Sequence, residues 1–432
     1  MNEAETNECV LSCNTGGDCR CIEHIVRIVL RYSLCIVVSL FLFLPVLVIF
    51  TIRKICNGRN IFLVERVLGK GAKPISVVYF NTNFYLFRIL PLFLCVLEGR
   101  LRIVGLSIKP AEYERTNGDE YLFHDKPGII SLLYIRQSTR IVHKSALETE
   151  REYLDNRSFR YDILLLLKSI PAFFYSTADL PLNDKVDILG VKFDNMTMKT
   201  AVNLIKNTII GKGSRFICFV NPDCLNKTFT DREYSGILQT ADNVFPDGIG
   251  INIACKIIKN PMRENINGTD MLPYLCEMCL QNGWGMYFLG AKPMVAVKMK
   301  GILEARYPGL KICGCTDGYF DRSRSDEIIE QVNSSGADIL LVAFGVPWQE
   351  KWLHKYKDKI NVPVMMGVGG LFDFYSGNIK RAPVWLREIG GEWIYRIMQE
   401  PGRMWKRYII GNPVFLYRVV RWKRCLSRQN GD

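Results

Sequence analysis

Residues 241–251 have the sequence Ala-Asp-Asn-Val-Phe-Pro-Asp-Gly-Ile-Gly-Ile, and this stretch decides the fold. The Val-Phe pair ends a short apolar run that is typical of a buried strand, and Pro246 stops the run. Asp247 comes next, Gly248 clears space beside it, and residues 251–258 are predicted to form the following helix. Open α/β sheets bind their ligands just beyond the carboxyl ends of their strands, which is where this carboxylate lies. The other interpretation is that Asp247 only caps the helix, and this stretch alone does not distinguish the two.

The same alternation of short apolar runs and helical stretches extends from residue 184 to about residue 378. Strands that alternate with helices indicate βαβ units, so we expect an α/β fold with a Rossmann-like, largely parallel sheet. Residues 188–194 are predicted to form the first strand and a turn, and residues 198–210 an amphipathic helix. The other predicted strands are residues 216–220, 244–245, 286–289, 310–313, 339–344 and 364–367. Because the carboxyl ends of parallel strands lie at one edge of a sheet, we expect one crevice there. It should collect the polar and glycine residues that follow the strands: Asn221, Asp247, Gly248, Gly290, Gln349 and Asp373.

Several nucleotide-binding and metal-dependent classes lack their motifs in this sequence. The Gly-Ala-Lys-Pro segment at 290–293 does not have the P-loop spacing GxxxxGK[ST], and no GxGxxG opens a helix near the first strand. No His, Cys and Asp residues have the spacing of a zinc hydrolase. We therefore expect neither an ATPase nor a dehydrogenase, and neither a metal nor another cofactor.

A series of longer motifs follows in order through more than half of the chain. They are Val-Asn-Pro-Asp at 220–223, Ala-Asp-x-x-x-Pro-Asp-Gly-Ile-Gly at 241–250, Asn-Gly-Thr-Asp at 267–270, Phe-Leu-Gly-Ala-Lys-Pro at 288–293, Asp-Gly-Tyr-Phe at 317–320, Phe-Gly-Val-Pro-Trp-Gln-Glu-Lys-Trp at 344–352, Gly-Val-Gly-Gly-Leu-Phe-Asp-Phe-Tyr-Ser-Gly-Asn-Ile-Lys-Arg-Ala-Pro at 367–383 and Glu-Trp-Ile-Tyr-Arg at 392–396. On these motifs, residues 186–415 resemble the WecG/TagA/CpsF glycosyltransferases, which form glycosyltransferase family 26.

The resemblance implies an inverting, metal-independent hexosyltransferase of cell-surface polysaccharide or teichoic acid assembly. Its donor would be a UDP-linked sugar of the N-acetylmannosamine type, and its acceptor a polyprenyl-diphosphate-linked sugar. Asp247 would be the general base that takes the proton of the acceptor hydroxyl. Gln349 would hold a sugar hydroxyl or the diphosphate, unless it serves only as a helix cap. The enzyme would lie on lipid at the cytoplasmic face of the bacterial cell membrane, where it could meet other polysaccharide-assembly enzymes.

Two positions differ from what the family pattern leads us to expect. Phe219 stands where a threonine is expected, and Asn265 stands where an arginine is expected. A hydroxyl and a cation near the donor are thus missing, so the identity of the sugar stays open.

The carboxy-terminal segment, residues 379–432, is basic and rich in aromatic residues. Between residues 380 and 428 it has twelve Lys and Arg against three Glu, in a chain whose net charge is +13. Interleaved aromatics favour a membrane interface, so no nucleic-acid partner is expected. The resemblance implies a helical appendage that folds over the site and supplies cations to the leaving diphosphate.

Particular basic residues are assigned to that task. Arg396, Arg403 and Lys406 have spacings that share one face of a helix, so we expect them to bind the leaving group together. Arg381 and Arg387 are expected to act at the entrance. The remaining basic residues are assigned to a solvated or lipid-facing surface: Arg407, Arg418, Arg421 and Lys423.

Residues 32–52 are an uncharged segment of 21 residues between basic flanks. The segment is long enough to span a bilayer as a helix. However, Pro45 lies inside it, and the basic flanks favour the cytoplasmic side at both ends. We expect a re-entrant helix that bends at Pro45, and the sequence leaves a spanning helix open.

Residues 25–178 resemble the monotopic phosphoglycosyl transferases, or bacterial sugar transferases. The resemblance rests on Glu-Arg-Val-Leu-Gly-Lys-Gly at 65–71, Leu-Pro at 90–91, Val-Leu-Glu-Gly-Arg-Leu-Arg-Ile-Val-Gly at 96–105, Lys-Pro-Gly-Ile-Ile at 126–130 and Tyr-Asp-Ile-Leu at 161–164. That family has a nucleophilic Asp and a Glu directly before Leu-Pro, whereas Arg88 and Ile89 stand here. An arginine cannot attack phosphorus, and an isoleucine cannot hold a magnesium ion. We therefore predict a catalytically inactive, membrane-inserted α/β module that is kept as a membrane anchor or as a partner.

The predicted organisation is a disordered leader at 1–24, the degenerate module at 25–178, the glycosyltransferase domain at 184–378 and the appendage at 379–432. A zinc or redox role for the leader's cysteines stays open. Two other functions are considered, a non-catalytic membrane scaffold and a bifunctional enzyme that also makes the lipid-linked first sugar. Intact Asp247 and Gln349 argue against the scaffold, and the missing Asp-Glu pair argues against the bifunctional enzyme.

Overall fold

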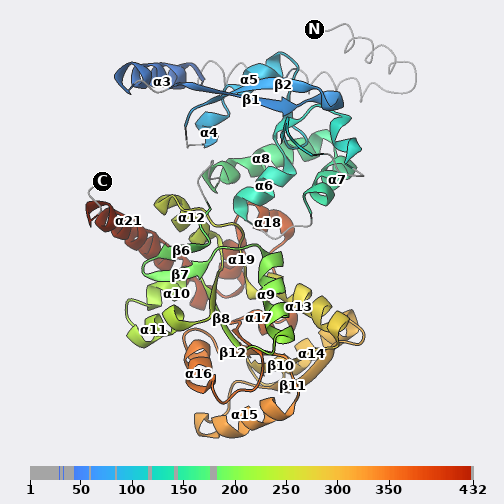
Figure 1. Ribbon diagram of the computed structural model, residues 1–432, viewed down its shortest axis with the longest axis vertical. Helices are drawn as coiled ribbons and strands as arrows, with labels where there is room; N and C mark the ends of the chain where they lie inside the picture. Colours follow the sequence, from blue (N-terminus) through green and yellow to red (C-terminus); the bar gives the residue numbers. More distant parts are fainter. Residues whose placement is uncertain are drawn as a thin grey trace. The chain divides into compact units, whose positions relative to one another are not determined.

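The computed structural model of the chain describes residues 29, 33, 43–57, 60–82, 85–114, 119–140, 145–175 and 182–429 (Figure 1). The chain divides into two compact units. The amino-terminal unit comprises residues 1–139 and 143–179, and the carboxy-terminal unit comprises residues 140–142 and 180–432. The predicted leader with its cysteines lies outside the described residues, and so do residues 34–42 of the predicted membrane segment.

The carboxy-terminal unit is built on a six-stranded sheet in which every neighbouring pair of strands is parallel. The strand order is β11-β10-β12-β13-β8-β9. The predicted α/β class and parallel sheet are therefore confirmed, and all but the first of the predicted strands lie in this sheet. Its strands are β8 (Arg215–Val220), β9 (Asn243–Pro246), β10 (Gly285–Gly290), β11 (Lys311–Thr316), β12 (Ile339–Ala343) and β13 (Val364–Gly367).

Both faces of the sheet are buried, because successive residues of a strand point to opposite sides. In β8, Phe216, Cys218 and Val220 belong to one hydrophobic core, and Ile217 and Phe219 belong to the other. Helices cover both faces (Figure 1). The first core is covered by α10 (Pro222–Lys227), α11 (Arg232–Thr240), α12 (Ile249–Ile258), α15 (Ser325–Ser334) and α16 (Trp348–Tyr356), and the second by α9 (Met198–Ile210), α13 (Gly268–Asn282), α14 (Val295–Arg306) and α17 (Leu371–Tyr375).

Residues 188–194, predicted as the first strand and a turn, do not belong to the parallel sheet. They lie in an antiparallel hairpin of β6 (Lys185–Ile188) and β7 (Val191–Asp194). Leu189 and Gly190 form its two-residue turn, and their φ angles are +57° and +82°. Positive φ at both positions is the geometry of the turn that joins antiparallel strands most tightly, so the apolar run is divided between two short strands.

The carboxy-terminal segment forms a series of helices, and the last of them packs against α10 and α12. The long helix predicted to align Arg396, Arg403 and Lys406 is interrupted at Glu400, which has φ −133° and ψ 62°. Pro401 follows this residue and disfavours the helical conformation before it, so the expected shared face is wrong. The elements are α18 (Val384–Glu388), α19 (Glu392–Gln399), α20 (Pro401–Trp405), the π-helix η5 (Lys406–Ile410) and α21 (Gly411–Gln429).

The amino-terminal unit has small sheets and its own apolar core. Strand β1 pairs with β2 and β4, and β3 pairs with β5. Val77, Val96 and Ile135 are fully buried in the core between these sheets and the helices. The elements are α3 (Leu44–Asn57), β1 (Phe62–Leu68), η2 (Lys70–Ala72), β2 (Pro74–Phe80), α4 (Tyr85–Arg88), α5 (Leu92–Leu97), β3 (Arg102–Val104), β4 (Lys109–Pro110), η3 (Glu120–Phe123), β5 (Gly128–Ile130), α6 (Leu132–Thr139), α7 (Ala146–Asn156) and α8 (Phe159–Tyr175).

None of the helices in the described ranges combines the length and the apolar composition needed to cross a membrane. Helix α3 begins at Leu44, so Pro45 lies in its first turn. Residues 34–42 are outside the described part of the chain, and the bend predicted at Pro45 stays a prediction.

Candidate active site

Asp247 lies at the carboxyl edge of the parallel sheet, one residue beyond β9. Its backbone N–H donates to the carbonyl of Val220 at 2.8 Å, which brings the ends of β8 and β9 together. The N-cap of α12 is Gly248, with a φ of +94°, and no side chain caps this helix. Capping therefore does not account for the aspartate.

Asn221 is the side chain that the structure places beside Asp247. Its Oδ1 caps α10 by accepting the backbone N–H groups of Asp223 at 3.1 Å and Cys224 at 3.2 Å. The amide nitrogen is left to face Asp247, and this hydrogen bond lowers the pKa of the carboxyl. Asn221 thus caps α10 with its oxygen and holds the Asp247 carboxylate with its amide nitrogen. The two residues lie together, as expected for residues that follow neighbouring parallel strands.

The pKa of Asp247 is raised to about 6 by burial of the carboxyl, and the nearby Glu392 and Asp270 add to this rise. The opposing charge comes from Arg407, which lowers the pKa. Arg407 lies in η5 and its Nε is 4.0 Å from a carboxylate oxygen of Asp223. A carboxyl that ionises near neutral pH is suited to general-base catalysis.

The predicted assignment of Arg407 to a solvated or lipid-facing surface is wrong. Its guanidinium lies among Asp223, Asp247 and Tyr408. The sequence offered no spacing signal for this position, because it depends on the break at Glu400 and on the π-helical turn that follows.

The pH dependence of turnover should report the ionisation of Asp247. Its raised pKa means that the carboxylate is the minor form below about pH 6, so kcat at saturating substrates should fall about tenfold per pH unit below that value. Initial rates between pH 4.5 and 8 would measure this. An acid limb near the ordinary aspartate pKa would contradict the assignment of Asp247 as the base.

Asp270, a site residue that sequence reasoning missed, holds the start of the appendage. It accepts a hydrogen bond from Arg381 at 2.5 Å and lies 3.9 Å from Arg387. Burial alone raises the pKa of Asp270, but the hydrogen bond and charge of Arg381 outweigh it, and the pKa is lowered. Arg381 also lies 3.5 Å from Glu392. Asp270 is the last residue of the Asn-Gly-Thr-Asp motif at 267–270, which is the signal that could have pointed to it.

Arg396 and Arg403 meet at one carboxylate rather than on one helical face. Both donate to Glu400, at 3.2 and 3.1 Å. The Arg396 side chain is 12% exposed and lies over the ring of Phe374, whereas that of Arg403 is 62% exposed. Lys406 is exposed. The charge of Arg396 lowers the pKa of Tyr408, and the charge of Asp247 raises it. Arg396 therefore lies near the same tyrosine as Asp247.

Gln349 is 1% exposed, and its side chain is occupied within the protein. Its Oε1 accepts the N–H groups of Gly345 at 3.2 Å and Gly369 at 3.0 Å, and its Nε2 donates to Glu350 at 2.7 Å. The cap of α16 is Pro347. Gln349 therefore connects the loops that follow β12 and β13 instead of capping a helix.

Gly290 and Asp373 lie farther from Asp247 along the sheet. Four strand spacings of about 4.8 Å separate β10 from β9, so Gly290 is about 19 Å away. A Cβ at Gly290 would lie within 2.7 Å of the Ala343 backbone, so close packing of β10 on β12 requires glycine there. Asp373 lies on α17, where Asn378 approaches its carboxylate at 3.5 Å. The residues assigned to the predicted crevice are thus spread along the edge of the sheet, with the aspartate at one end.

The two departures from the family pattern have structural partners. Phe219 is 7% exposed and packs on Phe245 and against Gly268 in the core. Asn265 accepts the N–H of Gly248 at 2.6 Å. Phe219 therefore fills core volume, and Asn265 fixes the residue next to the aspartate.

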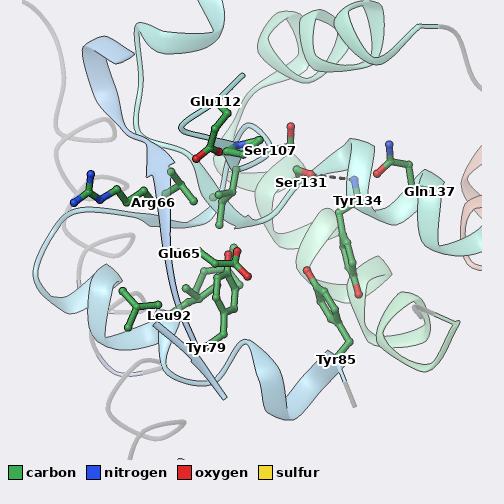
Figure 2. Close-up of a pocket in the computed structure, with 16 residues that line it drawn as sticks. Glu65, Arg66, Tyr79, Tyr85, Leu92, Ser107, Glu112, Ser131, Tyr134 and Gln137 are labelled. Carbon is green, nitrogen blue, oxygen red and sulfur yellow. Dashed lines mark hydrogen bonds between the residues drawn. The ribbon is translucent and has the colours of Figure 1, made fainter. Parts of the chain in front are cut away.

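The amino-terminal unit contains a separate cavity of about 600 Å³ (Figure 2). Glu65 and Tyr79 lie near its centre, and Arg66 points away from it. Arg88, which stands where the nucleophile of the phosphoglycosyl transferases is expected, donates to Glu65 at 3.0 Å. Its guanidinium lies 5.2 Å from the centre of the Tyr79 ring. At this position the structure thus has a cation bound to a carboxylate.

Comparison with protein families decides the assignment of the carboxy-terminal unit. The model of the glycosyl transferase WecG/TagA/CpsF family matches residues 186–429. The chain belongs to this family. The match includes every residue described above for the parallel sheet and its appendage, from β7 into α21. The prediction of a glycosyltransferase of the WecG/TagA/CpsF family is confirmed.

Three relatives of this WecG/TagA/CpsF protein share one enzyme name, N-acetylglucosaminyldiphosphoundecaprenol N-acetyl-beta-D-mannosaminyltransferase. The relative from Bacillus spizizenii is 32% identical over 213 residues, which are 49% of this chain and 81% of the relative. The relative from Staphylococcus aureus (strain MW2) is 31% identical over 250 residues, 56% of this chain and 95% of the relative. The relative from Bacillus subtilis (strain 168) is 32% identical over 224 residues, 51% of this chain and 86% of the relative.

Proposed function

We propose that this protein transfers an N-acetylmannosamine-type sugar from UDP to a polyprenyl-diphosphate-linked N-acetylglucosamine, with inversion and without a metal. The observation that carries the proposal is the Asp247 carboxyl, with a pKa of about 6, beside Asn221 and Arg407 at the carboxyl edge of the sheet. Family membership and the names of the relatives support the sugar and the lipid-linked acceptor.

The reaction needs one base and one set of cations. Asp247 takes the proton of the acceptor hydroxyl while that oxygen attacks the anomeric carbon of the donor. The bond from that carbon to the phosphate oxygen breaks, and UDP leaves with the electron pair. Attack from the face opposite UDP inverts the configuration, through an oxocarbenium-like transition state of the kind that glycosidases use.

The cations of the appendage would stabilise the negative charge on the leaving diphosphate. Arg407 is the best placed of them, because it already faces Asp223 and Asp247. Arg381, Arg396, Arg403 and Lys406 would contribute as the donor binds, since each lies on the same appendage. Arginine suits this task because its planar group binds two phosphate oxygens and keeps its charge.

Substrate contacts follow the strand ends. Asn221 would hold Asp247 in the orientation for proton transfer, and Gly248 would let the acceptor approach. Gly290 and Asp373 would serve the donor at the far end of the crevice. Gln349, whose amide is used within the protein, would act by shaping the loops rather than by touching the sugar.

The lipid-linked acceptor implies association with the membrane, and a UDP-sugar donor implies its cytoplasmic face. Exposed aromatic and apolar side chains on the appendage, including Trp385, Trp405 and Ile409, support contact with lipid. The amino-terminal unit would be a degenerate phosphoglycosyl transferase that serves as an anchor, a proposal supported by the Arg88–Glu65 pair.

The function can be tested with the full-length protein in detergent. UDP release would be measured with UDP-N-acetylmannosamine and a polyprenyl-diphosphate-N-acetylglucosamine analogue, with and without a chelator. Release that needs both substrates and survives the chelator is expected. Release that stops with the chelator would overturn metal independence, and turnover of none in a panel of UDP-sugars would support the scaffold.

The amino-terminal unit should not transfer phospho-sugar. Because Arg88 replaces the nucleophile, full-length protein given polyprenyl phosphate and UDP-sugars with Mg²⁺ should release no UMP. Chromatography separates UMP from the UDP of the other reaction. UMP formation that depends on polyprenyl phosphate would show that the module is active.

A further inference from the structure

Glu350 is a buried carboxylate to which the reaction gives no task. Its side chain is 0% exposed, and its Oε2 has no hydrogen-bond partner among the described residues. A buried acid with an unsatisfied oxygen is costly, and such groups in native proteins usually serve a purpose other than stability.

The other oxygen of Glu350 determines how the Gln349 amide is turned. The carboxylate oxygen Oε1 accepts from Nε2 of Gln349 at 2.7 Å, so the amide nitrogen must face Glu350. The amide oxygen then faces the two glycine N–H groups, which it accepts. With the amide turned the other way, its NH₂ group would face the two glycine N–H groups, so that hydrogen-bond donors would face donors. An acceptor at position 350 therefore specifies the whole arrangement.

The two glycines held by this amide shape the edge of the sheet. Gly345 follows β12 and Gly369 follows β13, with φ angles of +81° and +57°. The Gln349 side chain also packs at the end of β13, where a Cβ on Gly367 would lie 3.0 Å from Nε2. Any loss of the Gln349 orientation would release both loops at the carboxyl ends of β12 and β13.

We propose that Glu350 is a positioning residue of the transferase site, acting through Gln349 to hold the Gly345 and Gly369 loops in the shape that binds the nucleotide-sugar donor. The inference rests on the proposed function for its ligand. It assigns Glu350 to donor affinity and leaves proton transfer to Asp247.

The charge state of Glu350 gives this role a pH dependence. Burial raises its pKa to about 7, and the hydrogen bond from Gln349 and the charge of Lys227 lower it. The other titratable groups that face it are Cys218, Cys224 and Tyr234. A charged acceptor makes the stronger hydrogen bond, so the ionised form holds Gln349 better. Donor affinity should therefore weaken as pH falls through about 7.

The test is calorimetric titration with UDP at pH values from 5.5 to 8.5, using wild type, Glu350→Gln and the surface control Glu330→Gln. Glutamine mimics the protonated acid. Wild type should lose about tenfold in affinity between pH 8 and 6, as expected for an acid that ionises near 7. Glu350→Gln should bind about tenfold more weakly than wild type at pH 8 and equal it at pH 6. Ionisation of the UDP phosphate affects all three proteins equally, so it cancels when their affinities are compared at the same pH.

Two further readouts separate positioning from a structural role. With saturating acceptor, Glu350→Gln should raise the donor KM about tenfold at pH 8 and leave kcat unchanged. Hydrogen exchange at the Gly345 and Gly369 amides of wild type should be faster at pH 6 than at pH 8 after correction for intrinsic rates. This exchange measurement needs neither a variant that folds nor a ligand.

The outcomes are distinguishable. If Glu350→Gln keeps the wild-type KM and pH profile, the inference is overturned and the proposed function stands. If wild type binds no UDP at any pH, the proposed function fails, and protection of the glycine amides that does not change with pH would overturn the inference as well.

Discussion

Replacing Asp247 with asparagine should lower kcat by about 100- to 10,000-fold, the range that general-base catalysis contributes. Asparagine keeps the size and one acceptor oxygen of the side chain but cannot take the acceptor proton. Donor KM should change little, because the role proposed for this carboxyl is toward the acceptor hydroxyl. Initial rates of UDP release at pH 8 would measure both parameters.

The matched control for this substitution is Asp326→Asn. Asp326 is an exposed aspartate that pairs with Lys359, so the same chemical change there should leave kcat unaltered. If Asp247→Asn retains more than about a tenth of the wild-type kcat, a different group must act as the base.

Arg407→Gln should be the second most damaging substitution, with kcat reduced about 100- to 1000-fold. Losses of this size follow when a fixed group that stabilises transition-state charge is removed. The variant has a second signature, because the charge of Arg407 lowers the pKa of Asp247. Its acid limb should therefore move from about pH 6 to a higher value, which a pH–rate profile would detect.

Two variants check this interpretation of Arg407. Arg407→Lys keeps the charge but loses the planar guanidinium group. Compared with Arg407→Gln, its acid limb should therefore return close to the wild-type pH, while its kcat recovers less completely. Arg421→Gln changes an exposed arginine on α21 and should have no effect on either. An unchanged acid limb in Arg407→Gln would show that this residue does not act on the base.

The parallel sheet could be predicted because its strands carry their own signal. Each is a short apolar run, all but the edge strand β11 are buried on both faces, and most end in or lead directly into a glycine or a polar residue. The position of Asp247 at the carboxyl edge, beside Asn221, followed from that pattern alone. The hairpin at 188–194 was missed because an apolar run with one glycine does not reveal that the chain reverses at Leu189 and Gly190.

The appendage could be predicted only as a basic segment, because its geometry depends on tertiary contacts. The break at Glu400 turns Arg396 and Arg403 toward one carboxylate, and the π-helical turn directs Arg407 to the site. Asp270 received no role because its partner Arg381 is 111 residues away. The network of Gln349 and Glu350 could not be predicted either, because Gln349 also binds Gly369, which is 20 residues away in the sequence.

The most direct test of the central claim is the mass of the lipid-linked product. Full-length protein would receive UDP-N-acetylmannosamine, a polyprenyl-diphosphate-N-acetylglucosamine analogue and a chelator, beside the Asp247→Asn variant. The account predicts a wild-type product heavier than the acceptor by one N-acetylhexosamine residue, and only a trace of it with the variant. An unmodified acceptor with wild type, or equal product with the variant, would contradict it.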